Sequence, residues 1–169
     1  LSALSQNLNV IRSFAPNSNV WSVVKANGYG HGISRIWKSL SATEGFALLD
    51  FNEAILLRES GWQGPILLLE GFFTPADLIT IDHYRLTTSV HSDWQIQALA
   101  QANLSQPVNV YLKVNSGMNR LGFAPARVSD VWHQLRELKQ VGEITLMSHF
   151  ATADSVEGVD AQMAAVNLA

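Results

Sequence analysis

A lysine at the end of an apolar stretch is the residue of this sequence best placed for chemistry. Lys25 follows two valines and precedes a glycine-rich segment, residues 26–32, which carries Tyr29 and His31. If the apolar stretch is a parallel strand, Lys25 lies at the strand end where ligands bind in α/β proteins. Apolar neighbours can desolvate such an amine, lower its pKa and free it to attack a carbonyl carbon. The alternative interpretation is a solvated surface lysine beside a flexible turn.

The glycines at positions 28, 30 and 32 suggest an anion site, because bare backbone amides in front of a helix bind phosphate. Their pattern is G-x-G-x-G, and the lysine precedes them. Neither the dinucleotide fingerprint nor the P-loop has this order, so a nucleotide site is disfavoured. The hydroxyl of Tyr29, together with a helix N-terminus, could still hold one phosphate of a smaller cofactor.

A second candidate segment, residues 108–123, places Lys113 inside an apolar run and Arg120 in the loop beyond it. A buried Lys113 would need an acidic partner or conversion to a carbamate, whereas an outward-facing one would need neither. The residues leave both orientations open. Arg120 offers a planar donor for a carboxylate or a phenolate oxygen.

A histidine directly after another apolar run is the third candidate. His149 follows residues 143–147 and occupies the same strand-end level as Lys25. Taken singly, such a histidine is more often packed or solvated than catalytic, so its weight comes from the two other segments. The remaining histidines show no metal-ligand spacing, and we predict no metal site.

Six short apolar runs, mostly without polar alternation, are typical of parallel strands covered on both faces. They are residues 20–24, 45–49, 66–69, 86–90, 108–114 and 143–147. Helical patterns lie between them, at residues 32–40, 52–60, 75–83, 92–103 and 125–139. Thr74-Pro75, Ser92-Asp93 and Asn52-Glu53 are the expected helix starts. This α/β alternation fits an open doubly wound sheet or a (β/α)8 barrel, and a complete barrel needs eight units and about 250 residues.

The composition of the chain limits the classes of partner that it is expected to bind. The chain has 169 residues, 47% of them hydrophobic and 15% charged, with a net charge of −3, which disfavours a nucleic-acid surface. It contains no cysteine, which fits a reducing compartment, and no apolar run is long enough for a membrane span. We therefore expect a cytoplasmic protein with a small-molecule partner. Both ends fall within helical patterns, so we expect one incomplete domain over residues 1–169.

Together the motifs resemble the fold-type III pyridoxal-phosphate enzymes, and among them the bacterial alanine racemases. The motifs that carry the resemblance are W-S-V-V-K-A-N-G-Y-G-H-G at 21–32, Y-L-K-V-N-S-G-M-N-R-L-G-F at 111–123 and S-H-F-A-T-A-D at 148–154. The resemblance favours the barrel over the open sheet. It implies a partial (β/α)8 barrel with about six βα units and without the C-terminal β-domain of that family.

The resemblance also implies roles for individual residues. Lys25 matches the lysine that holds pyridoxal 5'-phosphate as an internal aldimine and acts as one of two racemisation bases. Tyr29 matches the tyrosine that contacts the cofactor phosphate, and His149 the histidine against the cofactor ring. Arg120 matches the arginine that donates to the phenolic oxygen and helps to orient the substrate carboxylate. Lys113 matches a lysine that is carbamylated in many members, as N6-carboxylysine, and that steadies this arginine.

The implied parent enzyme is an isomerase that interconverts L-alanine and D-alanine, either to supply D-alanine for the cell wall or for alanine catabolism. Its opposing base is a tyrosine from the C-terminal domain of the partner subunit of a homodimer, outside this sequence. We therefore expect the 169-residue chain alone to be inactive. Two alternatives stay open: a non-catalytic cofactor-binding fragment that needs a complementary chain, and another fold-type III amino-acid enzyme, which the 113–123 run disfavours.

Overall fold

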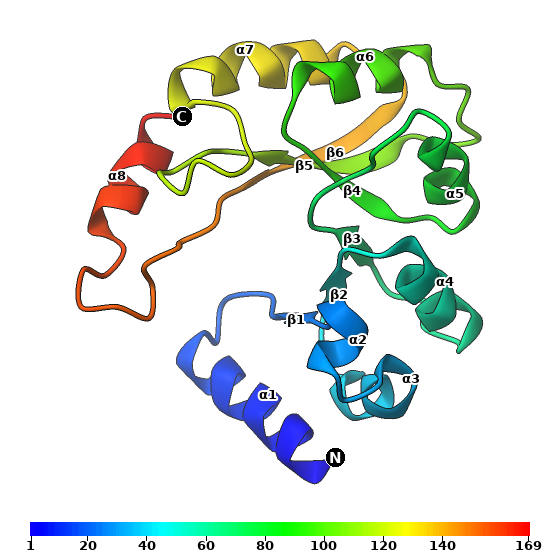
Figure 1. Ribbon diagram of the computed structural model, residues 1–169, viewed down its shortest axis with the longest axis vertical. Coiled ribbons are helices and arrows are strands. Elements are labelled where there is room, and N and C mark those ends of the chain that lie inside the picture. The colour runs from blue at the N-terminus through cyan, green and yellow to red at the C-terminus, as the bar shows by residue number, and fades with distance from the viewer. The chain divides into compact units, whose positions relative to one another are not determined.

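The computed structural model describes all residues from 1 to 169, and they form two compact units. The first unit comprises Leu1–Leu69 and Tyr84–Leu86, and the second Glu70–His83 and Thr87–Ala169. Strands and helices alternate along the chain in both (Figure 1). The alternation predicted from the apolar runs is confirmed, with each predicted strand present.

Three parallel strands in chain order form the centre of the first unit. They are β1 (Trp21–Val23), β2 (Gly45–Leu48) and β3 (Ile66–Leu68). Every residue of β2 and β3 is buried, which explains their lack of polar alternation. The helical segments of this unit are α1 (Ser2–Phe14), α2 (Lys25–Tyr29), α3 (Ile33–Ile36), a 3-10 turn at Trp37–Leu40 and α4 (Phe51–Glu59).

The second unit has the same plan, with β4 (Thr87–Val90), β5 (Val108–Lys113) and β6 (Val141–Met147) pairing in parallel. Its helices are α5 (Asp77–His83), α6 (Asp93–Gln101), α7 (Pro125–Arg136) and α8 (Asp160–Asn167). Figure 1 shows α6 and α7 along one side of these strands. None of the helices of the chain combines the length and apolar character that a membrane crossing requires.

Two helices begin at residues other than the expected ones. Asp50, rather than Asn52, caps α4, because its Oδ1 accepts the backbone N–H groups of Asn52 at 2.7 Å and Glu53 at 3.1 Å. Helix α5 begins at Asp77 and not at Pro75, and the Asp77 carboxylate accepts the N–H of Thr74 at 2.8 Å. In both places an aspartate within a few residues of the expected cap makes the bonds, as such positions favour.

Two strand boundaries and one helix also differ from those expected. Strand β6 begins at Val141, earlier than the expected residue 143, because Val141 pairs with Val108 of β5. Strand β1 ends at Val23, so that Lys25 lies in the short segment α2 and not in the strand. The segment expected as one helix over 32–40 is α3 followed by the 3-10 turn.

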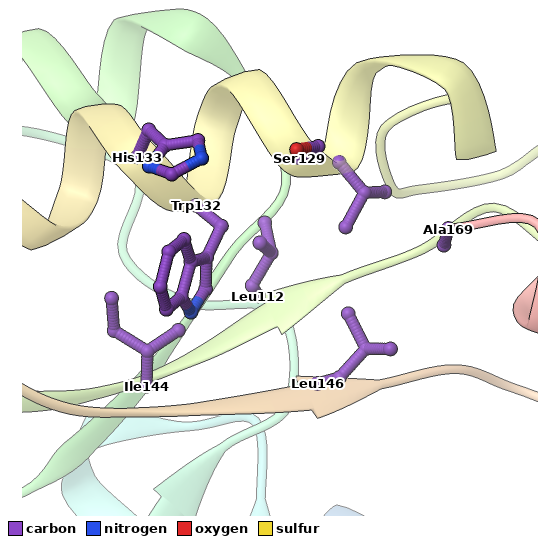
Figure 2. A pocket seen from close by; sticks show the side chains of 8 residues that line it. Leu112, Ser129, Trp132, His133, Ile144, Leu146 and Ala169 are labelled. Atoms are coloured by element: carbon purple, nitrogen blue, oxygen red, sulfur yellow. The ribbon is translucent and has the colours of Figure 1, made fainter.

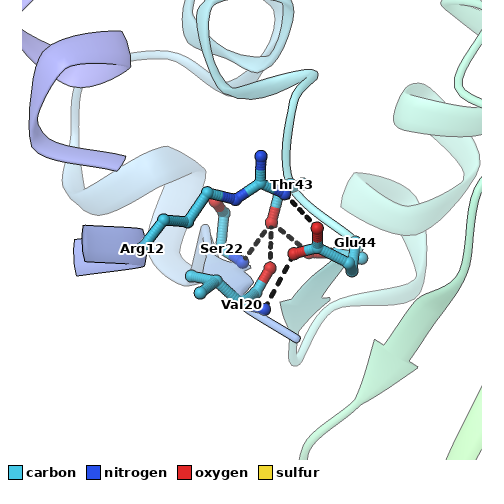
Figure 3. A network of polar contacts seen from close by, with 6 residues as sticks. Arg12, Val20, Ser22, Thr43 and Glu44 are labelled. Atoms are coloured by element: carbon cyan, nitrogen blue, oxygen red, sulfur yellow. Dashed lines mark hydrogen bonds and ion pairs between the residues drawn. The ribbon is translucent and has the colours of Figure 1, made fainter. Parts of the chain in front are cut away.

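A polar network attaches the loop before β1 to β2 (Figure 3). Glu44 forms an ion pair with Arg12 of α1, and its other carboxylate oxygen accepts the N–H of Val20 at 2.8 Å. The Thr43 hydroxyl accepts the N–H of Ser22 at 3.0 Å and donates to the Val20 carbonyl at 2.6 Å. Adjacent side chains thus satisfy the backbone at the start of β1, which carries the Lys25 segment.

A pocket of about 400 Å³ lies between α7 and the strands of the second unit (Figure 2). Its lining includes Leu112 of β5, Trp132 of α7 and Leu146 of β6, with Ala169 at one end. Side chains of a strand alternate between its two faces, so Lys113 points to the face opposite Leu112. The pocket therefore belongs to the helix-covered side of the strands, away from the candidate catalytic residues of this unit.

Candidate active site

Lys25 begins an ordered left-handed turn, at the place where the sequence predicts a glycine-rich loop. Residues 26–29 have φ angles between 52° and 61°, the left-handed region. Within the turn, the N–H of Gly28 donates to the Val24 carbonyl at 2.9 Å and the N–H of Gly30 donates to the Ala26 carbonyl at 3.0 Å. This conformation costs roughly 1–2 kcal/mol for each residue that carries a Cβ, so other contacts must hold it.

Asn27 makes most of those contacts. Its side-chain Oδ1 accepts the N–H of Ile33 at 2.9 Å, and its carbonyl accepts the N–H of Gly32 at 2.9 Å. Its own N–H donates to the Glu53 carboxylate at the start of α4. Gly28 is buried against Ile36, and a Cβ there would lie 2.5 Å from the terminal Cδ1 of that side chain, which would have to move. The order of this segment thus comes mainly from the hydrogen bonds of Asn27.

The turn brings the lysine and the tyrosine of this segment together. Lys25 Nζ lies 6.0 Å from the centroid of the Tyr29 ring, at the outer limit of a cation–π contact. Lys25 is partly buried above the buried Val24, while Tyr29 is 60% exposed. The Ile33 amide, which would begin the helix after the glycines, already donates to Asn27. Tyr29, whose side chain is exposed, is one group of this segment whose hydroxyl can hydrogen-bond an anion.

Lys113, Arg120 and His149 line one small pocket in the second unit, at the carboxyl ends of β5 and β6. Only 5% of Lys113 is exposed, so of the two orientations left open by the sequence the buried one is correct. A buried amine is stabilised only where charges or hydrogen bonds meet it. Three side chains from two motifs therefore meet around one cavity, as the positions of Lys113 and His149 at the ends of neighbouring strands predict.

The loop that carries Arg120 is closed at its base. The N–H of Asn115 donates to the Phe123 carbonyl, and the N–H of Phe123 donates to the Lys113 carbonyl, both at 2.9 Å. Gly122 has a φ of +115°, and a Cβ there would lie 2.6 Å from the backbone nitrogen of Asn115. The chain can therefore return toward Lys113 only through a glycine at this position.

Two serines connect this loop to the His149 segment. Ser148 Oγ lies 2.7 Å from Ser116 Oγ, and the Ser116 hydroxyl donates to the His149 carbonyl at 3.3 Å. Reasoning from the sequence missed both serines, although each lies inside a motif that it singled out. A hydroxyl pair fixes the backbone of His149 relative to the loop of Arg120, which keeps the pocket in one shape.

His91 is a further residue near this pocket that reasoning from the sequence missed. Its ring Nε2 lies 3.0 Å from the carbonyl oxygen of Glu70, and its backbone N–H donates to Gln95. Because that carbonyl can only accept, the neutral ring must carry its proton on Nε2. Burial lowers the pKa of His91, and the charge of Lys113 lowers it further, while the bond to the Glu70 carbonyl acts the other way. The available signal was its position directly after a strand.

Parallel βα units with polar side chains at the carboxyl ends of their strands define the class as an α/β protein. The alanine racemase N-terminal domain family matches residues 1–169, and the chain belongs to that family. The alanine racemase of Erwinia tasmaniensis is 67% identical over 157 residues, covering 93% of this chain and 44% of that protein. The catabolic alanine racemase of Salmonella typhimurium is 59% identical over 169 residues, covering 100% of this chain and 48% of that protein.

Solved structures of alanine racemases are similar to this chain in fold. The biosynthetic alanine racemase of Pseudomonas aeruginosa is similar with a TM-score of 0.92 at 36% identity, covering 98% of this chain and 47% of that one. The alanine racemase of E. faecalis has a TM-score of 0.89 at 30% identity, covering 99% and 48%. These likenesses confirm the predicted α/β fold as part of a (β/α)8 barrel. The chain spans about half the length of the relatives it matches.

Proposed function

We propose that this chain is the cofactor-binding part of an alanine racemase, an isomerase that interconverts L-alanine and D-alanine with pyridoxal 5'-phosphate. The observation that supports this most is the ordered turn that presents Lys25 beside Tyr29, directly after the first strand. Family membership and relatives that are themselves alanine racemases support the same proposal.

The side chains present fit this cofactor by their chemistry. An amine, that of Lys25, suits its aldehyde, and the exposed hydroxyl of Tyr29 suits its phosphate. In the second unit, Arg120 lines the pocket beside the buried Lys113 and can donate to a phenolic oxygen or a substrate carboxylate. His149 lines the same pocket and offers a flat ring for packing. The aldehyde, the phosphate, the phenolic oxygen and the ring face of the cofactor thus each have a chemically suitable side chain in this chain.

Pyridoxal phosphate, when bound, supplies an electron-withdrawing ring that acidifies the α C–H bond of an amino acid attached to it. Lys25 Nζ holds the cofactor at rest and serves as one base, exchanging a proton with the α-carbon on its own side. Arg120 would donate to the substrate carboxylate. A carbamate on Lys113, formed from carbon dioxide with loss of a proton, gives Arg120 an anionic neighbour that keeps its guanidinium oriented.

Racemisation requires a proton to leave one face of the α-carbon and return to the other, so a single amine cannot complete it. We place the opposing base, a tyrosine of the C-terminal domain of a partner subunit, outside this chain. The homodimer is therefore part of the proposal, and the 169-residue chain alone is expected to be inactive.

Labelling with pyridoxal phosphate tests the cofactor assignment. The chain is incubated with it and reduced with borohydride, and the modified lysine is located by peptide mass spectrometry. We expect the label on Lys25 and its loss in Lys25→Arg, whereas Lys38→Arg, which removes an exposed lysine of the same unit, leaves it unchanged. Label spread evenly over Lys38 and Lys139, both exposed, would contradict the assignment.

A racemase assay tests whether the second base lies outside this chain. The isolated chain is expected to show no turnover of L-alanine. Co-expression with the remaining part of the Salmonella typhimurium relative is expected to restore it, since that part would carry the second base. Turnover by the isolated chain near that of a full-length relative would overturn the proposal that the second base lies elsewhere.

A further inference from the structure

Glu53 contacts the Lys25 turn from outside it. One carboxylate oxygen, Oε1, accepts the N–H of Asn27, from the middle of the left-handed turn. The neighbouring amides of Gly28 and Gly30 bond to carbonyls at residues 24 and 26, within the same stretch of chain. Among these bonds, the one from Glu53 is the contact that comes from a different helix. It ties the turn to the first turn of α4.

The position of Glu53 is itself fixed. Its backbone N–H donates to Oδ1 of Asp50, the residue that caps α4, at 3.1 Å. The side chain is partly buried, and its second oxygen, Oε2, is shielded from solvent with no hydrogen-bond partner. A shielded carboxylate oxygen without a donor lowers stability, so native proteins keep few of them. If the Glu53 carboxylate contributed only to stability, we would expect both of its oxygens to face water.

We propose that Glu53 is a positioning residue for Lys25: its carboxylate holds the left-handed turn that sets Lys25 against Tyr29, and so sets the reactivity of the amine. This rests on the proposed function, in which Lys25 holds the cofactor. Glu53 acts through the Asn27 amide and touches neither cofactor nor substrate. The second oxygen stays unpaired because the first is committed to the turn.

The sequence has no pattern that points to this role. Glu53 lies at the expected start of a helix, where an acidic residue of the first turn is expected to interact favourably with the helix dipole. Glu59, at the other end of the same helix and exposed, provides a matched control.

The experiment compares Glu53→Ala, Glu53→Gln, Glu53→Asp and Glu59→Ala in the 169-residue chain. The first measurement needs no cofactor: the exchange rate of the Asn27 amide proton, followed by NMR. In the unchanged chain and in Glu53→Gln, which keeps an oxygen acceptor at the same reach, we expect protection. In Glu53→Ala and Glu53→Asp, whose acceptor is absent or too short, we expect exchange faster by about tenfold or more.

The second measurement is the rate of labelling of Lys25 by pyridoxal phosphate. The amine condenses with the aldehyde with loss of water, and borohydride reduces the new C=N bond to a stable secondary amine. We expect Glu53→Ala and Glu53→Asp to label about tenfold more slowly, because small misplacements of a reacting group have effects of this order. Glu53→Gln and Glu59→Ala are expected to stay within about twofold of the unchanged chain.

The outcomes test the positioning role of Glu53 separately from the proposed function of Lys25. Equal Asn27 exchange in Glu53→Ala and the unchanged chain would overturn the positioning role, whatever the labelling shows. A Glu53→Gln variant that labels as slowly as Glu53→Ala would also overturn it, because the charge and not the acceptor would then matter. If Glu53→Ala fails to fold, the comparison of Glu53→Asp with Glu53→Gln decides in the same way. An unchanged chain that is never labelled contradicts the proposed function, while the exchange rates still decide the role of Glu53.

Discussion

The side-chain oxygen of Asn27 accepts a hydrogen bond from the backbone N–H of Ile33 at 2.9 Å. This contact closes the chain over residues 28–32 and keeps Lys25 and Tyr29 on one ordered turn. Asparagine suits this position doubly, because it tolerates the left-handed conformation better than most residues and carries an acceptor on a short side chain.

Asn27→Ala is expected to lower the free energy of unfolding by about 1–2 kcal/mol, because it removes the acceptor and leaves a Cβ in the left-handed region. Asn27→Asp keeps an acceptor and should stay close to the unchanged chain. Urea denaturation followed by circular dichroism measures the difference. Equal midpoints for the alanine and aspartate variants would show that the contact with Ile33 contributes nothing.

Thr43 and the Arg12–Glu44 ion pair both attach the start of β1, but they are expected to contribute unequally to the free energy of unfolding. Thr43 is 6% exposed and bonds to the backbone of both Val20 and Ser22, whereas the Arg12–Glu44 ion pair is about one-third exposed. Thr43→Val keeps the shape and leaves the partly buried N–H of Ser22 without its acceptor, while the Val20 carbonyl keeps its bond from the Glu44 N–H, for a loss of about 1–3 kcal/mol. Arg12→Lys leaves the Glu44 contact to Val20 in place and should change stability by less than about 1 kcal/mol. Thermal unfolding of both variants measures the two losses of stability. A larger loss for Arg12→Lys would show that the ion pair, and not Thr43, contributes most to the network in Figure 3.

Gly122 and Gly117 separate the effect of backbone strain from that of a clash. Both have positive φ angles, +115° and +129°, but only at Gly122 would a Cβ meet the backbone, at 2.6 Å from Asn115 N. Gly117→Ala should lose about 1 kcal/mol through strain, and Gly122→Ala about 1–3 kcal/mol more. The Gly122 variant should also lose fluorescence-detected binding of pyridoxal phosphate, since the Arg120 loop must shift. Equal stability of the two variants would argue against the close approach at residue 122.

His91 gives the stability of the chain a pH dependence of known sign. Its pKa in the folded state is lowered from 6.5, first by burial and then by the charge of Lys113 while that amine is unmodified, with Glu70 acting in the opposite direction. The unfolded chain therefore binds this proton more readily, and stability is lost as the pH falls through the unfolded value toward the lower folded value. Above that window His91 has no effect on the pH dependence.

His91→Gln is expected to remove this loss, so its stability should fall less between about pH 7 and pH 5 than that of the unchanged chain. His31→Gln, which replaces an exposed histidine, serves as the control and should keep the original slope. Chemical denaturation at several pH values provides the curves. Parallel curves for the chain and for His91→Gln would show that the folded pKa is not depressed.

Local features were predictable from the sequence because they depend on neighbouring residues. Apolar runs without alternation identify strands buried on both faces, and Lys25 and His149 stand out by following such runs. Helix starts were less well predicted. Both Asp50 and Asn52 can cap a helix, and the residue that does so is the one whose carboxylate reaches the free amides once the helix has docked.

The burial of Lys113 was not predictable from its run, because alternation along β5 puts Lys113 on the same face as Asn109, and this face is exposed at Asn109 but buried at Lys113. The left-handed turn after Lys25 was hidden for a similar reason, since glycine and asparagine permit this conformation without requiring it. Bonds between distant residues decide both, such as Asn27 with Glu53 and Ser116 with Ser148.

The sequence by itself determined the order of strands and helices, the residues able to do chemistry and the family to which they belong. The tertiary structure alone decided which of those residues share a pocket, which conformation the Lys25 segment adopts and which side chains hold it there. The physical reason is the distance along the chain over which the deciding interactions act. Secondary structure follows from periodicity and backbone preferences within a few residues, whereas the geometry of a site depends on hydrogen bonds and close packing between segments that only folding brings together.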